Sequence, residues 1–362
     1  MDYLLAELLD DVEALVTCES PSEDLEAVAA SADVVARVGE KRLGVEPERV
    51  GPVDLRWKFG DGPTKVLLLC HHDTVWPLGT LARKPFSVED GVLRGPGCFD
   101  MKAGLVMALH AVAGLEDRAG VTLLVTGDEE IGSLNSRALI EEEARGARAA
   151  LVFEASADGG ALKVERKGVS MYRVRVVGKA AHAGLEPERG INATVELAHQ
   201  VLAVNGLGDT ALGTTVTPTV LSSGTTGNTV PAAGEFSVDV RARTVAEQFR
   251  VDAALHALTP VVSGARIEVE GQPNRPPLMA EASAALFERA VAVAASLGLP
   301  PLAGVAVGGG SDGNFTAGIG TPTLDGLGAV GGGAHAEHEH VLVDELPSRT
   351  ALVAALVADL LA

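Results

Sequence analysis

KVLLLCHHD at residues 65–73 is followed by MKAGLVMALHAVAGL at 101–115, VTLLVTGDEE at 121–130 and AALVFEA at 149–155. The first, third and fourth stretches are short apolar runs that end in polar residues, as buried strands do, whereas the second has the length and spacing of a helix. Strands that alternate with helices indicate a mostly parallel sheet covered by helices. We therefore predict an α/β fold.

The pattern changes twice along the chain. Before the quoted stretches we expect helices at 3–17 and near 24–43. From about residue 168 apolar and polar residues alternate, as in antiparallel strands, in VSMYRVRVVG, TVTPTVLSSG and GEFSVDVRART, with helices near 190–204 and 245–257. From about residue 280 the parallel rhythm returns, with a helix at 281–297, strands LAGVAV and TPTLD, and a closing helix near 345–361. We predict a catalytic α/β domain of residues 1–167 and 279–362, interrupted by a smaller α+β domain of residues 168–278.

Composition narrows the classes of function. A chain of 362 residues with 47% apolar content can bury the cores of two domains. Its net charge of −20 and scattered Lys and Arg residues argue against nucleic acid as a partner. Three cysteines without paired spacing argue against disulfides and thiolate zinc sites, and the chain has neither a signal-peptide pattern nor an apolar run of membrane-spanning length. We expect a cytoplasmic protein that does not contact membranes.

Acidic and imidazole side chains gather where the predicted strands end. Ligands of open α/β sheets bind beyond the carboxyl ends of the strands. The residues at these ends, and in the loops beside them, are His71, His72, Asp73, Asp100, Asp128, Glu129, Glu130, Glu154 and His335. Carboxylates brought this close together repel one another unless cations neutralise them, and mixed His, Asp and Glu sets suit Zn²⁺ in hydrolytic sites. The sequence therefore predicts a pair of metal ions.

Local spacing suggests roles for four of these residues. His71 and Asp73 are two apart in an extended segment and so face one side, which lets Asp73 accept the second imidazole proton of a metal-bound His71. Glu129 and Glu130 are adjacent and should point in different directions. One of them can then bind metal while the other faces the substrate as a general base.

The motifs CHHDTV, RGPGCFDMKAG, TGDEEIGS, VFEAS, GKAAHAGLEPERGINA, GNTVP, DVRAR and GGAHAEHE resemble, in order and spacing, those of the dinuclear-zinc aminoacylase and glutamate carboxypeptidase metallopeptidase family. The resemblance runs from about residue 65 to the end of the chain. It implies that Asp100 bridges two zinc ions, with cobalt or manganese as substitutes. His71 and Glu154 would complete one site, Glu130 and His335 the other, and Glu129 would be the general base.

The resemblance also gives the inserted domain a role as a lid and a dimerisation domain. His182, Asn228 and Arg241 match family positions that contact substrate. We expect Arg241, with Arg275 as a second candidate, to bind the substrate carboxylate, because guanidinium groups suit its two-pronged geometry. The turn around Gly310 would offer backbone N–H groups to the substrate. His338 and His340 match no ligand position and should be exposed.

These expectations describe a zinc hydrolase that cleaves an amide bond next to a free carboxylate. HHDTVWPLGT is closer to the glutamate carboxypeptidase pattern than to the deacetylase or desuccinylase patterns, which favours a carboxypeptidase that releases a C-terminal glutamate or a similar amino acid from a small peptide. N-acyl amino acid deacylases and dipeptidases of the same family are the alternatives. We expect a homodimer formed through the inserted domain, with His182 serving the active site of the neighbouring chain.

Two other classes of protein compete with this interpretation. Residues 309–313 satisfy the GxSxG nucleophile pattern, so Ser311 could act in a serine hydrolase with Asp325 and His335. Such a triad leaves Asp100, Glu129, Glu130 and Glu154 without a role. The second competitor is a metal-binding regulatory dimer without turnover, in which a general base such as Glu129 would have no purpose.

Overall fold

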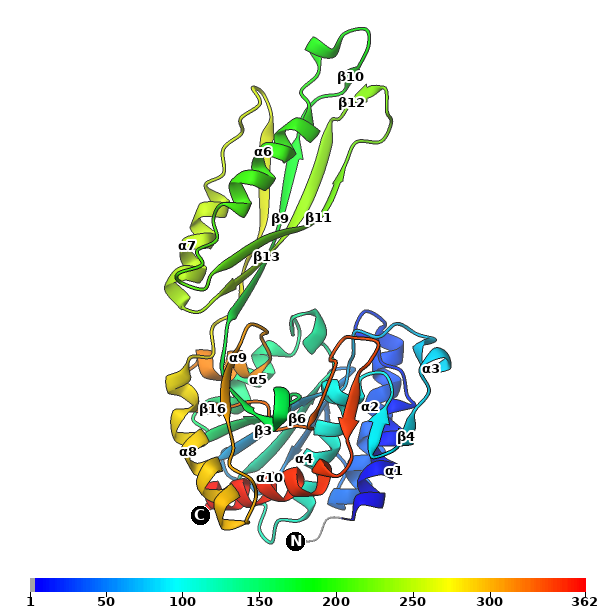
Figure 1. Ribbon diagram of the computed structural model, residues 1–362, viewed down its shortest axis with the longest axis vertical. Coiled ribbons are helices and arrows are strands. Elements are labelled where there is room, and N and C mark those ends of the chain that lie inside the picture. Colours follow the sequence, from blue (N-terminus) through cyan, green and yellow to red (C-terminus); the bar gives the residue numbers. More distant parts are fainter. Residues whose placement is uncertain (1–3) are drawn as a thin grey trace. The chain divides into compact units, whose positions relative to one another are not determined.

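The computed structural model describes residues 4–362, which form two compact units (Figure 1). The first, called the α/β unit, contains the chain up to Glu165 together with Leu278–Val307 and Ser311–Ala362. The second, called the inserted unit, contains Arg166–Pro277 and Gly308–Gly310. None of the described helices combines the length and apolar content needed to cross a membrane.

The α/β unit is built on a six-stranded sheet of order β1-β2-β6-β3-β7-β16. Its strands are β1 (Glu48–Val50), β2 (Asp54–Lys58), β3 (Val66–His71), β6 (Val121–Thr126), β7 (Ala149–Val152) and β16 (Thr323–Leu324). The neighbouring strands β6, β3, β7 and β16 are parallel to one another, whereas β2 pairs antiparallel with β6 on one side and with β1 on the other. Every residue of β3, β6 and β7 is buried, as expected for strands covered on both faces. The predicted α/β fold class is confirmed.

Helices cover both faces of this sheet. Leu68 and Leu123 belong to one apolar cluster, whereas their neighbours Leu67 and Leu124 belong to another, because successive strand residues face opposite sides. The first cluster receives side chains from α1 (Leu5–Val16), α2 (Leu25–Leu43), α4 (Ala103–Ala113), α8 (Ala280–Ser296) and α10 (Glu345–Leu361). The second receives them from α5 (Arg137–Ala144) and α9 (Gly313–Gly318). Residue 3, where we expected the first helix to begin, lies outside the described residues.

A small antiparallel sheet of order β17-β18-β5-β4 brings two distant segments together. Its strands are β4 (Ser87–Glu89), β5 (Val92–Arg94), β17 (Gly331–Gly332) and β18 (His340–Leu342). The short helix α3 (Thr80–Arg83) precedes β4, and the irregular turn η1 (Cys98–Lys102), which contains the cis peptide Asp100–Met101, follows β5. The sheet therefore places the turn that carries Asp100 beside the loop that carries His335.

One expected strand of the main sheet lies elsewhere. LAGVAV forms β15 (Gly304–Val307), but it pairs with β8 (Leu162–Arg166) in a separate two-stranded sheet. Its small side chains are alternately exposed and half-buried, so it lacks the apolar bulk that a strand buried on both faces requires. Only the TPTLD segment returns to the parallel sheet, as β16.

The inserted unit is an antiparallel sheet of order β11-β13-β9-β14 with α6 (Ala193–Asn205) and α7 (Val245–His256) packed on one face (Figure 1). Its strands are β9 (Gly168–Val177), β11 (Thr215–Ser223), β13 (Ala233–Ala242) and β14 (Arg266–Arg275). Buried and exposed residues alternate along β9, the pattern of a sheet covered on one face. A ribbon of β10 (Ala181–His182) and β12 (Thr229–Val230) extends from the unit. β14 was not predicted from the sequence.

Candidate metal centre

The carboxyl edge of the parallel sheet brings five acidic and imidazole residues of the sequence together. His71 ends β3, Glu129 and Glu130 lie in the turn η2 (Glu129–Ile131) after β6, and Glu154 follows β7. Asp100 reaches the same edge from η1. Three neighbouring strand ends and the turn η1 therefore supply these side chains, and Glu129 and Glu130 share one strand end.

Asp100 lies between the two imidazoles. Its Oδ1 is 3.4 Å from His71 Nε2, and its Oδ2 is 3.3 Å from His335 Nε2. The same His71 Nε2 lies 3.6 Å from Glu154 Oε1, and His335 Nε2 is 3.1 Å from Glu130 Oε1. Two groups thus share Asp100: one contains His71 and Glu154, the other His335 and Glu130.

The donor atoms fit metal ions. Ligand atoms of His71, Asp100 and Glu130 lie within 4.8 Å of one another, and so do those of His71, Glu129 and Glu154. Among the described residues, buried His71 Nε2 and Asp100 Oδ1 find no hydrogen-bond partner, and their 3.4 Å approach does not have hydrogen-bond geometry. Unpartnered buried polar atoms are costly, so a cation that both atoms can bind removes the cost.

The charges of the cluster also call for a cation. Burial opposes a charge on His71, yet Asp100, Asp73 and Glu154 raise its pKa well above its usual value. Hydrogen bonding by Asp100 and Glu130 raises the pKa of His335 to about 11. The carboxylates therefore attract positive charge strongly, and protons on the imidazoles compete with metal for this position.

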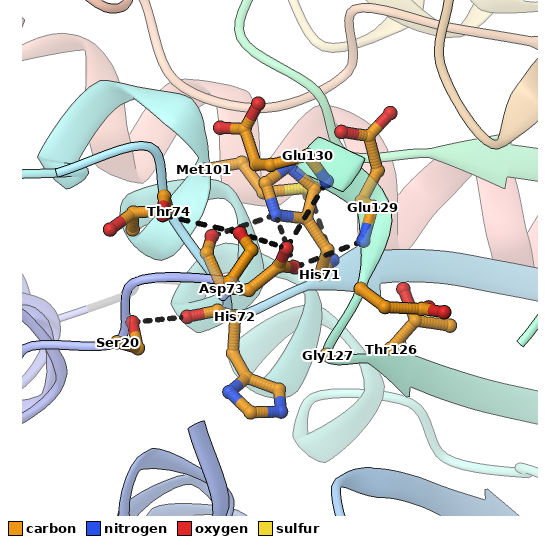
Figure 2. Close-up of polar contacts among 12 residues, drawn as sticks. Ser20, His71, His72, Asp73, Thr74, Met101, Thr126, Gly127, Glu129 and Glu130 are labelled. Atoms are coloured by element: carbon orange, nitrogen blue, oxygen red, sulfur yellow. Dashed lines mark hydrogen bonds and ion pairs between the residues drawn. The ribbon is translucent and has the colours of Figure 1, made fainter. Parts of the chain in front are cut away.

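Asp73 connects His71 to the glutamate turn. Its Oδ1 lies 3.3 Å from His71 Nδ1 and accepts the backbone N–H of Glu129 at 3.2 Å. Its Oδ2 accepts the backbone N–H of Glu130 at 3.1 Å and the hydroxyl of Ser22 at 2.6 Å. Figure 2 shows that the side chains of both glutamates consequently point away from Asp73. Asp73 is fully buried, so this arrangement is shielded from solvent.

Burial distinguishes the members of the cluster. Glu129 and Glu154 are buried, whereas the His335 side chain is 49% exposed. His335 also has a φ of 61°, a backbone conformation that few residues other than glycine adopt. His340 donates from Nδ1 to the carbonyl of His338, 2.9 Å away, and no ion pair between His340 and the cluster is found among the described residues.

Ser311 is not arranged as a nucleophile. It is fully buried, and its hydroxyl donates directly to Asp325 at 2.5 Å and accepts the backbone N–H of Gly313. A serine nucleophile needs an accessible oxygen whose proton passes to a histidine. The GxSxG match therefore reflects a buried turn before α9.

The inserted unit groups the expected substrate-binding residues at two separate places. His182 pairs with Thr229 across the β10–β12 ribbon, and the carbonyl of Asn228 accepts the N–H of Ala183 at 2.9 Å, so His182 and Asn228 are neighbours. His182 Nδ1 accepts the N–H groups of Gly184 and Leu185. The proton of the neutral ring is therefore on Nε2.

Arg241 and Arg275 lie near the opposite end of the sheet, because both pair with Val169 of β9. The Arg241 guanidinium binds Asp239 at 2.8 Å and is partly exposed, whereas Arg275 is buried. Gly310 is held by Arg166, whose Nη1 donates to its carbonyl at 3.2 Å. About eight residues of β9 separate Val169 from the end of the strand nearest the β10–β12 ribbon. At about 3.3 Å per residue, the two arginines and the ribbon residues are therefore separated by about 26 Å along the strand.

Glu339, for which the sequence predicted no role, is buried beside the cluster. Its carboxylate accepts four hydrogen bonds, three of them from the turn that carries Asp100. The sequence shows Glu339 only as an acidic residue in HAEHEH, between His338 and His340, which were expected to be exposed. Nothing in this motif distinguishes Glu339 from Glu337.

Comparison with known proteins places the whole chain among metallopeptidases. Residues 67–359 match the profile of peptidase family M20/M25/M40. The chain is 32% identical to carboxypeptidase G2 of Pseudomonas sp. (strain RS-16), over 98% of this chain and 89% of the relative. It is 28% identical to a succinyl-diaminopimelate desuccinylase of Methylorubrum extorquens (strain PA1), over 94% of this chain and 95% of the relative.

Solved structures share the fold. An M20 family metallo-carboxypeptidase from Sulfolobus solfataricus superposes with a TM-score of 0.77 at 19% identity, covering 99% of each chain. A Bacillus subtilis protein described as a dinuclear metal binding peptidase of the M20 family superposes with a TM-score of 0.63 at 15% identity, covering 98% of each chain.

Proposed function

The chain belongs to peptidase family M20/M25/M40, and from this premise we propose that it is a two-metal carboxypeptidase that cleaves an amide bond next to a free carboxylate. The observation that carries the proposal is the position of Asp100 between two imidazoles, with one carboxylate oxygen toward each. Similarity to carboxypeptidase G2 along nearly the whole chain supports a carboxypeptidase, and we expect release of a C-terminal glutamate or a similar amino acid.

His71, Asp100 and Glu154 would hold one ion, and Asp100, Glu130 and His335 would hold the other. We propose zinc, with cobalt or manganese as substitutes, because mixed imidazole and carboxylate sets suit these ions. Bound ions would polarise the scissile carbonyl and make a water molecule more acidic. Asp73, through its contact with His71 Nδ1, would orient that ligand.

Glu129 would transfer the proton. It would accept the proton that the attacking water loses as the new C–O bond forms, and it would return this proton to the nitrogen as the C–N bond breaks. Two observations support this role. Its backbone N–H is fixed by Asp73, and its buried side chain points away from that contact toward the metal cluster.

The inserted unit would supply substrate contacts as part of a homodimer. His182 and Asn228 lie at one end of its sheet and Arg241 and Arg275 at the other, so one inserted unit cannot bring both groups to the same small substrate. In a dimer, His182 of the neighbouring chain would donate from Nε2 to the developing oxyanion, while Arg241, Arg275 and the backbone at Gly310 would bind the substrate carboxylate and backbone.

The exposed edge of the inserted unit supports this assembly. β11 is an edge strand, on which Val220 and Leu221 are exposed, and Leu202 on α6 is 73% exposed. Pairing two copies of this edge about a two-fold axis would bury these side chains and satisfy the free strand edge.

Similarity to a desuccinylase along 94% of the chain favours an N-acyl amino acid deacylase as the second candidate, with a dipeptidase as a further member of the same group. All three cleave an amide beside a carboxylate.

A panel of dipeptides, N-acyl glutamates and other N-acyl amino acids, each assayed with an amidated control that lacks the free carboxylate, tests the proposal. We expect hydrolysis of the free acids and at least 100-fold lower kcat/KM for the amidated controls, since a lost charge-assisted pair costs about 3 kcal/mol. Equal rates would contradict carboxylate recognition.

A further inference from the structure

The four hydrogen bonds of Glu339 converge from two segments. Oε1 accepts the backbone N–H groups of Phe99 and Asp100 at 3.0 and 3.1 Å. Oε2 accepts the backbone N–H of Gly97 at 3.0 Å and the indole N–H of Trp76 at 2.7 Å. All four partners are donors, so the site requires two acceptor oxygens, which only a carboxylate offers.

Glu339 stands where two ligand-bearing loops start from paired strand ends. His340, the first residue of β18, lies opposite Arg94, the last residue of β5. Past Arg94 the chain turns to Asp100, and before Glu339 it turns from His335. The proposed ligands at the far ends of these loops approach to 3.3 Å, between Asp100 Oδ2 and His335 Nε2.

We propose that Glu339 is a positioning residue that fixes Asp100 relative to His335 and so sets the metal affinity of the site formed by Asp100, Glu130 and His335. The inference rests on the proposed metal centre. Glu339 is linked to both ligands: its carboxylate binds the backbone of the turn that carries Asp100, and its own loop carries His335 four residues earlier. A shift of this carboxylate therefore changes the distance between two ligands without removing either.

Glu339→Gln isolates this role because the amide keeps the size of the side chain. Whichever way the amide turns, its NH₂ group faces two of the four donors, and either the pair from Phe99 and Asp100 or the pair from Gly97 and Trp76 loses its acceptor. Outer partners of metal ligands typically contribute 10- to 100-fold to metal affinity. We expect cobalt binding at one site to weaken by about that factor.

The test titrates metal-free protein with Co²⁺ and follows visible absorption, which reports ligand geometry, together with binding heat. The matched control is Glu337→Gln, two residues away, whose side chain is 76% exposed and 3.5 Å from Lys84. We expect wild type and the Glu337→Gln variant to bind two equivalents with the same spectrum. The Glu339→Gln variant should bind one equivalent normally and the second with weaker affinity and an altered spectrum.

A merely structural role would lower the melting temperature of the metal-free Glu339→Gln protein and leave both cobalt affinities and the spectrum unchanged, and this result would overturn the inference. If that variant does not fold, Glu339→Asp decides, because it keeps the charge but is too short to reach both segments: weakened binding of the second ion supports the role, and unchanged binding refutes it. A wild-type protein that binds no cobalt would instead refute the proposed metal centre.

Discussion

Replacing Glu129 by Gln should stop turnover and leave both metal ions bound. The amide has the same size, and the backbone N–H of Glu129 would keep its hydrogen bond to Asp73. The side-chain amide of the Glu129→Gln variant is neutral and cannot accept a proton from water, unlike the carboxylate of Glu129. General acid–base groups contribute about 10²- to 10⁴-fold each, and Glu129 is proposed to act in two proton transfers, so kcat should fall by about 10³-fold or more. This corresponds to about 4 kcal/mol in the activation barrier.

Glu130→Gln should have the opposite signature. Glu130 Oε1 lies 3.1 Å from His335 Nε2, at the proposed second metal site. Removing one unit charge about 4 Å from another in a partly buried site costs about 4 kcal/mol, or about 10³-fold in affinity. The variant should therefore lose one metal ion on gel filtration, with partial recovery of activity at high metal concentration.

The assay is elemental analysis of both variants after gel filtration, together with kcat at saturating metal. It separates two roles that geometry alone allows, since Glu129 also lies within 4.8 Å of the ligand atoms of His71 and Glu154. Loss of metal from Glu129→Gln would make Glu129 a ligand. Normal turnover by Glu129→Gln with both metals bound would refute the proposed mechanism.

Three further predictions address other parts of the chain. Inactive Glu129→Gln and His182→Ala chains, mixed and allowed to exchange, should recover about a quarter of wild-type activity, because half of the dimers are mixed and one site in each is complete; exchange without recovery would refute action across the interface. Ser311→Ala should lower the melting temperature through loss of its bond to Asp325 but reduce kcat by less than about tenfold, and a loss of about 10⁴-fold or more would restore the serine mechanism. Burial and nearby carboxylates raise the pKa of Asp54 from 3.8 to about 7, so the stability contributed by its protonated form is fully present below about pH 4 and is lost as the pH rises through 7. The free energy of unfolding of metal-free Asp54→Asn, measured in urea, should therefore gain up to about 4 kcal/mol over that of metal-free wild type between pH 4 and pH 8, and a difference that stays constant with pH would contradict the shift.

The sequence sufficed for the α/β fold and the family because both depend on local patterns. The runs at 66–71, 121–126 and 149–152 are apolar at every position, which marks strands buried on both faces, and the rule that polar residues at their ends share one edge brought His71, Glu129 and Glu154 together. Family membership and the hydrolase class are confirmed by the family match and by the relative that is 32% identical.

What the sequence did not reveal depends on long-range pairing. Glu339 acquires its partners only because β18 pairs with β5 about 245 residues earlier, and no local pattern carries that register. β14 was missed because its residues are mostly exposed or half-buried and include Pro273, which weakens strand periodicity. The GxSxG match at 309–313 could be disfavoured from the sequence but not excluded, since a short motif carries no information about the burial of Ser311.

Metal content measured together with activity tests the central claim most directly. Protein dialysed exhaustively against a chelator should contain no bound transition metal and hydrolyse no substrate. Without the ions nothing in the proposed site would activate water or the amide carbonyl, because the roles proposed for the ligands depend on bound metal. These ligands are His71, Asp100, Glu130, Glu154 and His335. Adding zinc should restore activity in proportion to binding, up to two ions per chain. Full activity in protein shown by elemental analysis to be metal-free would contradict the account.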